Sequence, residues 1–416
     1  MTNNNAELSR KLISKLGRPV RLIVVAMLAL ILLIPLEMVE SVVRERYSTY
    51  QTVVADIAGA WSSDQQIAGP ILIVPFTEKI EVRDEYITSE GEKKVSTRWE
   101  TRQKRAVILP DVLSYEGSLT PEMRQRGIYE VQVYTADLVV SGAFRNLPEV
   151  VASLRTEDRL DAIEWSKAVV SFGLSDPRGI VEVDGFDFNG NPAQPRPGTT
   201  LDTLVPRGFH MSVGEFLTDD LEFRLPLVIR GSGSLRFLPL GETTRGSLRS
   251  DWPHPSFIGD VLPASRVIND RGFSAEWTIP WLNRSYPQAW VAGDEVCIDE
   301  IEAGVRLFEP VALYDLVTRA VKYGLLFIAL TFLTLGLIES VFDVKLSLVQ
   351  FLLIGVALAI FFLILVALAE HIGFTAAYIL ASSIVVVINT LYCAAILPRR
   401  STSILVGGVL TCLLYT

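Results

Sequence analysis

Long apolar runs constrain this chain more than any other feature, and they lie at its two ends. Leu22–Pro35 is almost purely apolar, and most of the sequence after Tyr323 is apolar as well. The stretch between them has the mixed pattern of a water-soluble domain. An apolar helix of roughly 20 residues matches the hydrocarbon thickness of a bilayer. The arrangement predicts a membrane protein with a large polar domain between its hydrophobic ends, and it argues against a wholly cytosolic enzyme or a disordered chain.

The first apolar run has two interpretations, a cleaved signal peptide and a retained anchor. The run passes Pro35 into Glu37 and Glu40 without a small-x-small cleavage site. We therefore favour an uncleaved membrane helix within residues 19–36. The basic residues before it place the N-terminus in the cytoplasm, so the chain emerges on the outer side. These basic residues are Arg10, Lys11, Lys15, Arg18 and Arg21.

Further apolar runs after residue 319 predict a C-terminal bundle of membrane helices. If the polar region stays outside, the first of these helices runs inward and the next two alternate. Arg399 and Arg400 then fall in the cytoplasm, in agreement with the orientation taken from the N-terminus. The last run is short of the roughly 20 residues that a span needs, so we expect a chain that is cut within a helix or that ends unusually. The runs are about 323–338, 346–369, 372–397 and 401–416.

The polar region, residues 41–318, predicts one helix followed by a β-rich domain. Ser41–Trp61 has apolar residues at helical spacing, and Gly69-Pro70 is expected to end that helix. Strand-like alternation follows, most clearly in Tyr129–Phe144. Because no long helices alternate with the strands, an antiparallel sandwich or a pair of sandwiches is favoured over a parallel α/β sheet.

The expected fold class is therefore an α+β membrane protein in three parts. Residues 1–40 hold the basic N-terminus and one transmembrane helix. Residues 41–318 form a sandwich-like periplasmic domain. Residues 319–416 form a C-terminal transmembrane bundle.

Motifs of known catalytic and metal sites are missing from the sequence. It has no HExxH, CxxC, GxSxG or P-loop pattern, and its three histidines are far apart. A Ser-His-Asp arrangement stays open, because such a site is defined by geometry and not by order. The net charge of −9 argues against a nucleic-acid partner. We expect no cofactor and no metal, and a non-enzymatic role is favoured without being decided. The histidines are His210, His254 and His371.

Ser250–Phe257 is the most unusual polar segment. Pro253 and Pro255 enclose His254 and stiffen its backbone. A rigid histidine near Asp251 is typical of a base or a ligand. The favoured interpretation is structural: a stiff crossover loop whose Trp252 and Phe257 close the end of the sandwich. All seven tryptophans of the chain lie in the polar region, where core packing is favoured over a ligand platform.

Glu370-His371 is the second candidate, at the outer edge of the membrane in this topology. The pair is either solvated there, which is favoured, or part of a polar site that faces the outer domain. Arg319 and Lys322 mark the same boundary, where they are expected to reach lipid headgroups, although they are a mild exception to the positive-inside rule. Asn389 lies in the next helix, where it is able to bond across helices.

Several longer motifs stand out: Gly69–Pro75, Ser175–Gly179, Ser250–Gly259, Gly272–Trp277, Arg319–Gly324, Leu326–Phe332 and Glu370–Phe374. These motifs resemble the CreD-type inner-membrane proteins, and the likeness extends over nearly the whole chain. The resemblance implies one N-terminal span, a large periplasmic domain and a C-terminal bundle in the inner membrane of Gram-negative bacteria. It also implies a role in cell envelope integrity and β-lactam response, with no accepted catalytic mechanism. Ser347-Leu348 departs from a His-Pro pair of the family, and the family continues beyond this chain's last helix.

Two functions follow from these patterns. The favoured one is an inner-membrane protein that supports envelope integrity, whose periplasmic domain binds an envelope lipid, glycan or protein partner. The alternative is a transporter or enzyme that handles lipid or glycan at the outer leaflet, with Glu370 and His371 in its site. A sensor that relays domain occupancy inward ranks last, because the inner loops are short.

Overall fold

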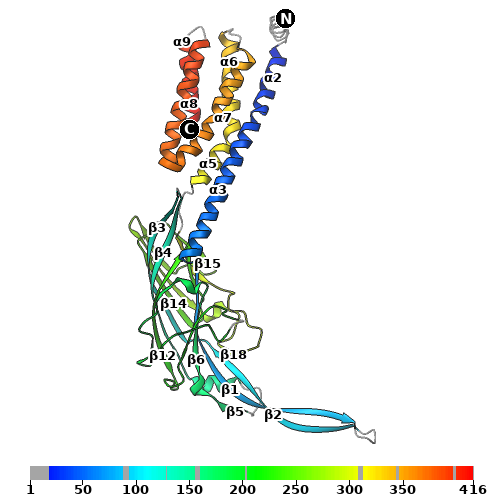
Figure 1. The fold of residues 1–416 in the computed structure, drawn as a ribbon, viewed down its shortest axis with the longest axis vertical. Coiled ribbons are helices and arrows are strands. Elements are labelled where there is room, and N and C mark those ends of the chain that lie inside the picture. The colour runs from blue at the N-terminus through cyan, green and yellow to red at the C-terminus, as the bar shows by residue number, and fades with distance from the viewer. Residues whose placement is uncertain are drawn as a thin grey trace. The chain divides into compact units, whose positions relative to one another are not determined.

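The computed structural model describes residues 18–87, 93–127, 129–154, 160–201, 204–307, 313–342, 346–396 and 400–415. It divides into two compact units (Figure 1). Met1–Val53 and Val311–Thr416 form the helical unit, and Val54–Pro310 forms the β-rich unit. The predicted cytoplasmic residues Arg10, Lys11, Lys15 and Arg399 lie outside the described ranges.

The helical unit confirms the prediction of several apolar helices. In the described ranges, four helical stretches are long and apolar enough to cross a membrane: Ile23–Trp61, Tyr314–Val341, Leu348–Ile372 and Phe374–Ala395. A further helix, α9, coincides with the last predicted run and has 16 residues. The helices are α2 (Arg18–Ile31), α3 (Leu33–Trp61), α5 (Leu313–Lys322), α6 (Gly324–Phe342), α7 (Leu348–Ile372), α8 (Phe374–Ile396) and α9 (Arg400–Tyr415).

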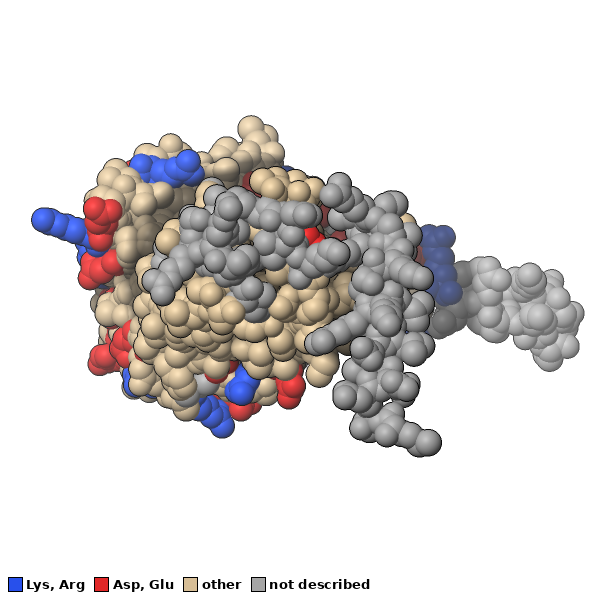
Figure 2. Space-filling model, turned by 90° about the horizontal axis from the view of Figure 1, so that it is seen from above, with Lys and Arg blue, Asp and Glu red and all other residues tan. Residues whose placement is uncertain are grey.

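These helices present large apolar side chains on their outer surfaces. Leu337 on α6, Val349 on α7 and Leu391 on α8 are 57%, 62% and 66% exposed. In Figure 2 the middle of the described surface is mostly uncharged, and Lys, Arg, Asp and Glu lie toward its margins. A water-soluble protein rarely exposes contiguous apolar patches of this kind. The surface therefore fits a lipid bilayer environment.

Two helix boundaries differ from the sequence prediction. The predicted run 323–338 is too short, since α6 continues through Glu339 to Phe342, and Glu370-His371 lies in the last turn of α7 instead of interrupting it. The break comes at Gly373, which has φ 77° and donates its N–H to the Ala369 carbonyl at 3.1 Å. Glycine adopts this left-handed conformation at little cost, whereas Glu and His are tolerated within a helix. Gly373 is therefore the residue that separates α7 from α8.

Close packing within the helical unit depends on Gly355 of α7. A Cβ built at this position would lie 2.2 Å from Leu32 Cδ1 and 2.9 Å from Phe332 Cζ. Leu32 sits between α2 and α3, and Phe332 belongs to α6. A small residue thus lets three helical segments approach one another, as is common in membrane bundles.

We expect Gly355→Ala to destabilise the helical unit by on the order of 1–2 kcal/mol, because the added methyl group forces Leu32 and Phe332 apart. Gly336→Ala on α6 is the matched control, since nothing lies within 4 Å of its Cβ position. Thermal unfolding in neutral detergent, followed by far-ultraviolet circular dichroism, measures both. Equal midpoints for the two variants would contradict tight packing at Gly355.

The β-rich unit holds two sheets, which confirms the prediction of a large β-rich domain. The ten-stranded sheet has the order β10-β11-β6-β1-β13-β19-β15, with β2 and β5 paired to β1 and β18 to β2. The nine-stranded sheet has the order β16-β17-β14-β3-β4-β12-β8-β9, with β7 paired to β12. Most pairs are antiparallel, as expected, but β1 with β13 and β14 with β3 are parallel.

The strands of the two sheets have the following bounds. They are β1 (Gln65–Ile87), β2 (Lys93–Ile108), β3 (Val112–Arg126), β4 (Tyr129–Phe144), β5 (Leu160–Ile163), β6 (Val169–Leu174), β7 (Ile180–Glu182), β8 (Asp187–Phe188), β9 (Asn191–Pro192), β10 (Arg196–Pro197), β11 (Gly208–Ser212), β12 (Leu221–Ser232), β13 (Ser234–Phe237), β14 (Thr243–Ser250), β15 (Pro255–Gly259), β16 (Ser265–Asn269), β17 (Gly272–Pro280), β18 (Ala289–Val291) and β19 (Ala303–Leu307). Short helical segments are α4 (Leu147–Ser153), η1 (Trp165–Lys167), η2 (Pro177–Gly179) and η3 (Trp281–Asn283).

The helix of the polar region ends at Trp61, as the spacing predicts, but Gly69-Pro70 is not what ends it. β1 begins at Gln65 and runs through this pair, whose peptide bond is cis. The register of β1 against β6 shifts between Ala68 and Ile71, so the pair is accommodated at an irregularity in the ladder. The prediction that Gly69-Pro70 breaks the helix was therefore wrong.

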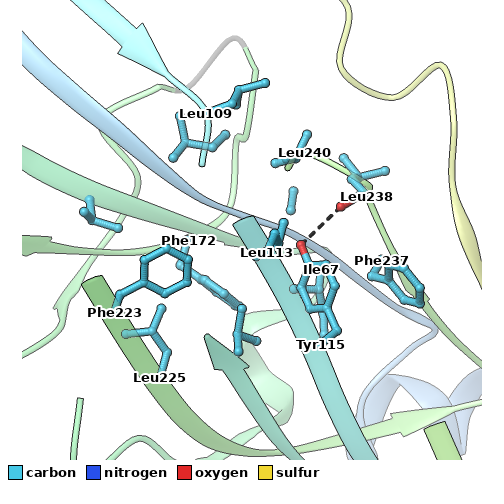
Figure 3. Close-up of a cluster of buried hydrophobic side chains, with 14 of the residues drawn as sticks. Ile67, Leu109, Leu113, Tyr115, Phe172, Phe223, Leu225, Phe237, Leu238 and Leu240 are labelled. Atoms are coloured by element: carbon cyan, nitrogen blue, oxygen red, sulfur yellow. Dashed lines mark hydrogen bonds between the residues drawn. The ribbon is translucent and has the colours of Figure 1, made fainter. Parts of the chain in front are cut away.

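Both sheets contribute to one buried hydrophobic cluster, part of which Figure 3 shows. Tyr115 of β3 is 2% exposed and points toward the ten-stranded sheet. Its hydroxyl donates to the Gly69 carbonyl at 2.8 Å or to the Leu238 carbonyl at 3.2 Å. Burial raises the pKa of this phenol above its usual range. A neutral, hydrogen-bonded tyrosine therefore links the two sheets at their core.

Candidate functional site

The Ser250–Gly259 motif is a crossover between the two sheets. β14 ends at Ser250 in the nine-stranded sheet, and β15 begins at Pro255 in the ten-stranded sheet. Phe257 meets Phe273 and Trp277 with ring centroids 5.9 Å apart in each case. Trp252 is half-buried and packs against the core. These contacts are those of the stiff crossover loop that the sequence favours.

The structure places the two ionisable residues of this motif at the surface. Asp251 and His254 are both exposed, and within the described residues no hydrogen bond or ion pair joins them. The His254 ring meets the Trp252 ring edge-on, with centroids 6.4 Å apart. Asp251 and His254 thus lie on one loop without forming an acid–base pair.

Glu370 lies in a different environment, inside the helical unit. Its side chain is only 9% exposed. The Tyr314 hydroxyl of α5 donates to Glu370 Oε1 at 3.0 Å, and Arg46 Nε of α3 lies 3.9 Å from the same oxygen. Three helices that are far apart in the sequence therefore meet at this carboxylate. We call Glu370, Tyr314 and Arg46 the Glu370 cluster.

Aromatic rings complete the Glu370 cluster on one side. The ring of Tyr314 lies 6.1 Å from that of Tyr47 and 6.0 Å from that of Tyr50, both on α3. His371, the neighbour of Glu370, is exposed. The Glu370-His371 pair is therefore split, with the carboxylate held between helices and the imidazole facing outward. A carboxylate withdrawn from solvent and paired with a cation can orient a polar group of a ligand.

The other residues singled out in the bundle occupy ordinary positions. Arg319 and Lys322 are exposed in the last turn of α5, where cations interact favourably with the helix dipole. Asn389 is 1% exposed, and its side chain donates to the Val385 carbonyl of its own helix at 3.1 Å. The hydrogen bond recorded for Asn389 thus lies within α8 and not across helices.

An ion pair that the sequence did not single out lies where α3 leads into β1. Asp176 is 3% exposed, and its carboxylate accepts from the Ser63 N–H at 3.0 Å and from Arg178 Nε at 2.8 Å. Arg178 in turn donates to the Gly59 carbonyl in the last turn of α3 at 2.9 Å. The Arg178 side chain holds the pKa of Asp176 well below its usual range. These residues explain part of the Ser175–Gly179 motif.

Trp61, the last residue of α3, is fixed at the same place. The guanidinium groups of Arg124 and Arg230 lie 4.3 Å and 4.2 Å from its ring centre. Its indole N–H donates to the Tyr134 carbonyl at 3.4 Å. Cations over a tryptophan face are attracted by its negative surface. For Trp61, these contacts fit the packing interpretation of the tryptophans and not the ligand-platform interpretation.

A hollow of about 420 Å³ lies on the nine-stranded sheet. It crosses β14, β3, β4 and β12, which are adjacent in that order. Its outward side chains alternate with buried ones such as Tyr115 and Leu119, so it is on the face turned away from the core. Charged groups in its lining are Glu116, Asp137, Glu182, Asp184 and Arg249. We call it the sheet hollow. Periodicity alone cannot show it, because a concave face depends on the curvature of several strands.

Among the described residues, no group of three or more His, Cys, Asp or Glu side chains has the geometry of a metal site. His210 contacts the Gly198 carbonyl through Nδ1 at 2.7 Å.

The apolar helices and the large β-rich unit together define a membrane-protein-like chain. The family model described as "Inner membrane protein CreD" matches residues 18–416. The Inner membrane protein CreD of Escherichia coli (strain K12) is 33% identical over 380 residues, which covers 90% of this chain and 81% of the relative. The chain therefore belongs to the CreD family of inner membrane proteins, as the motifs indicated.

Proposed function

We propose that this chain supports the integrity of the cell envelope as a non-enzymatic binding protein of the inner membrane. Its N-terminus lies in the cytoplasm, and its β-rich unit lies in the periplasm and binds an envelope component or partner. The basic residues before the first helix, together with Arg399 and Arg400, support this orientation. The sheet hollow carries the binding role, because it is concave and combines apolar side chains with several polar groups.

A second candidate function is the handling of lipid or glycan at the outer leaflet. The observation that favours it is the Glu370 cluster, in which a nearly buried carboxylate is held by residues of two other helices. Ionisable residues withdrawn into a helical bundle are expensive and are often functional. In this proposal Arg319 and Lys322 contact lipid headgroups beside the site.

Complementation of a strain that lacks this protein tests both functions, with envelope permeability to a detergent or dye as the readout. We expect Asp137→Asn combined with Glu182→Gln to lose at least half of the rescue, because the hollow loses two of its four carboxylates. Glu370→Gln is expected to rescue fully under the binding proposal. The matched control is Glu215→Gln with Asp219→Asn, which removes two charges of the β-rich unit outside the hollow. Immunoblots of membranes report the level of each variant.

The outcomes separate the two candidates. Full rescue by the hollow variant would remove the binding role of this face. Loss of rescue by Glu370→Gln at normal protein level would favour the outer-leaflet site instead. His254→Ala is expected to rescue fully because its ring is exposed on the crossover loop.

A further inference from the structure

The sheet hollow has the size of a small-molecule site and is built by side chains from neighbouring strands. Ligand pockets are typically about 300–1,000 Å³, and the hollow has about 420 Å³. One row across the sheet runs from Val228 to Asp137, then to Ser118 and Arg249. A second row runs from Pro226 to Val139, Glu116 and Ser247. Hydrophobic, hydroxyl and charged side chains thus alternate across the floor of the hollow.

Carboxylates outnumber cations in the lining of the hollow, and the charged residues are spread along it. Glu182 is paired with Val228 of β12, which in turn is opposite Asp137 of β4. Directly opposed residues have Cβ atoms about 4.5–5.5 Å apart, so two steps across the sheet place the Cβ atoms of Glu182 and Asp137 roughly 10 Å apart. Glu116 lies in the second row, and Asp184 follows β7. The single cation of the lining, Arg249, lies on β14 at the other side of the hollow.

We propose that the sheet hollow binds a small organic oligocation, a flexible apolar stem that carries two or more ammonium groups. This inference rests on the proposed binding function and names its ligand class. Spaced carboxylates match spaced ammonium groups, and the valine and proline side chains between them match methylene segments. An anionic ligand such as a phosphate or a nucleic acid is repelled by four carboxylates against one guanidinium.

The test is calorimetric titration of the full chain in neutral detergent with spermidine at physiological salt. We expect saturable binding, and a Kd at least tenfold higher for Asp137→Asn combined with Glu182→Gln. The double variant Glu215→Gln with Asp219→Asn is expected to bind like the wild type, although it has the same net charge as the hollow variant. A neutral polyether of similar length, triethylene glycol, is expected not to bind.

Arg249→Gln gives a test that misfolding cannot imitate. Removing the one cation of the hollow is expected to tighten spermidine binding two- to fivefold, because the ligand no longer meets a like charge. A gain of affinity requires a folded hollow. Weaker binding by Arg249→Gln would overturn the proposal.

Other results would also overturn it. Absence of saturable binding, or equal loss in the hollow and control variants, would show that no oligocation site exists on this face. Binding of a tetralysine peptide without binding of spermidine would indicate a basic protein partner instead. If spermidine does not bind but the hollow variant still fails in complementation, the ligand class is wrong and the binding function stands.

Discussion

Trp277→Ala is expected to lower the free energy of unfolding of the β-rich unit by about 3–5 kcal/mol. Trp277 is 1% exposed and packs edge-on against Phe237 with ring centroids 5.7 Å apart. Its indole N–H donates to the Val261 carbonyl at 3.1 Å. Among the described residues of the unit, Trp277 has the largest fully buried side chain, so the substitution leaves a cavity, and it leaves the Val261 carbonyl without this donor. Chemical denaturation followed by tryptophan fluorescence gives the free energy.

Trp281→Ala is the matched control for this prediction. Trp281 lies four residues further along the chain and is 45% exposed. Its backbone N–H, which donates to the Glu242 carbonyl, is retained in the variant. We expect a loss below about 1 kcal/mol, since surface substitutions away from special features cost little. Similar losses for the two variants would contradict the core role of Trp277.

Local patterns predict the elements of this protein well, because they report which face of each element is buried. The alternation in Tyr129–Phe144 matches β4 to the residue. The helical spacing through Trp61 predicts where α3 ends, and the apolar runs predict the helices of the bundle. The error concerns a predicted boundary between elements. Gly69-Pro70 predicts a break in the chain's regular structure. The pair nevertheless lies within β1, because the apolar segment Ile71–Val74 that follows it pairs with β2 and β6.

The pairing of distant segments could not be predicted, because it depends on topology. Nothing in the local sequence of β14 indicates that it lies parallel to β3, although this pairing brings Ser247 and Arg249 beside the β3 residues of the sheet hollow. The Glu370 cluster has the same origin. Glu370 was a candidate from its position, but its partners Tyr314 and Arg46 come from helices brought together only by the fold. An ionisable residue between apolar runs indicates a candidate site. The residues that it contacts are identified only from the structure.

The structure explains the glycine of the Ser175–Gly179 motif. A Cβ at Gly179 would lie 2.4 Å from the Arg230 carbonyl and 2.5 Å from Gln65 Nε2. Gln65 Nε2 itself contacts the carbonyls of Asp176 and Arg230. Glycine is thus needed where the Arg230 backbone and the Gln65 side chain both approach this position. The motif positions the end of α3 in the β-rich unit.

Asp176→Asn is expected to lower the free energy of unfolding of the β-rich unit by about 1.5–3 kcal/mol at pH 7, because hydrogen bonds to a charged group are lost. The Asp176 side chain is 4% exposed, and both of its oxygens accept from Arg178. An asparagine keeps one acceptor for the Ser63 N–H but has no charge for the guanidinium. The end of α3 and η2 should loosen together. Asp219→Asn, on an exposed carboxylate, is the control with the same change of charge.

The effect of Asp176→Asn should depend on pH in a stated direction. The pKa of Asp176 in the folded chain lies below that of an unfolded aspartate, which is near 3.9, so its charge stabilises the fold fully above about pH 5. This stabilising contribution decreases as the pH falls below the pKa of the unfolded aspartate. It is lost as the pH falls through the pKa of Asp176 in the folded chain. The difference in the free energy of unfolding between wild type and Asp176→Asn should therefore be constant from pH 7 to about pH 5 and should be smaller at pH 3.5. Denaturation midpoints at these three pH values measure it. A gap that widens in acid would mean that the carboxylate is not held by Arg178 in the folded protein.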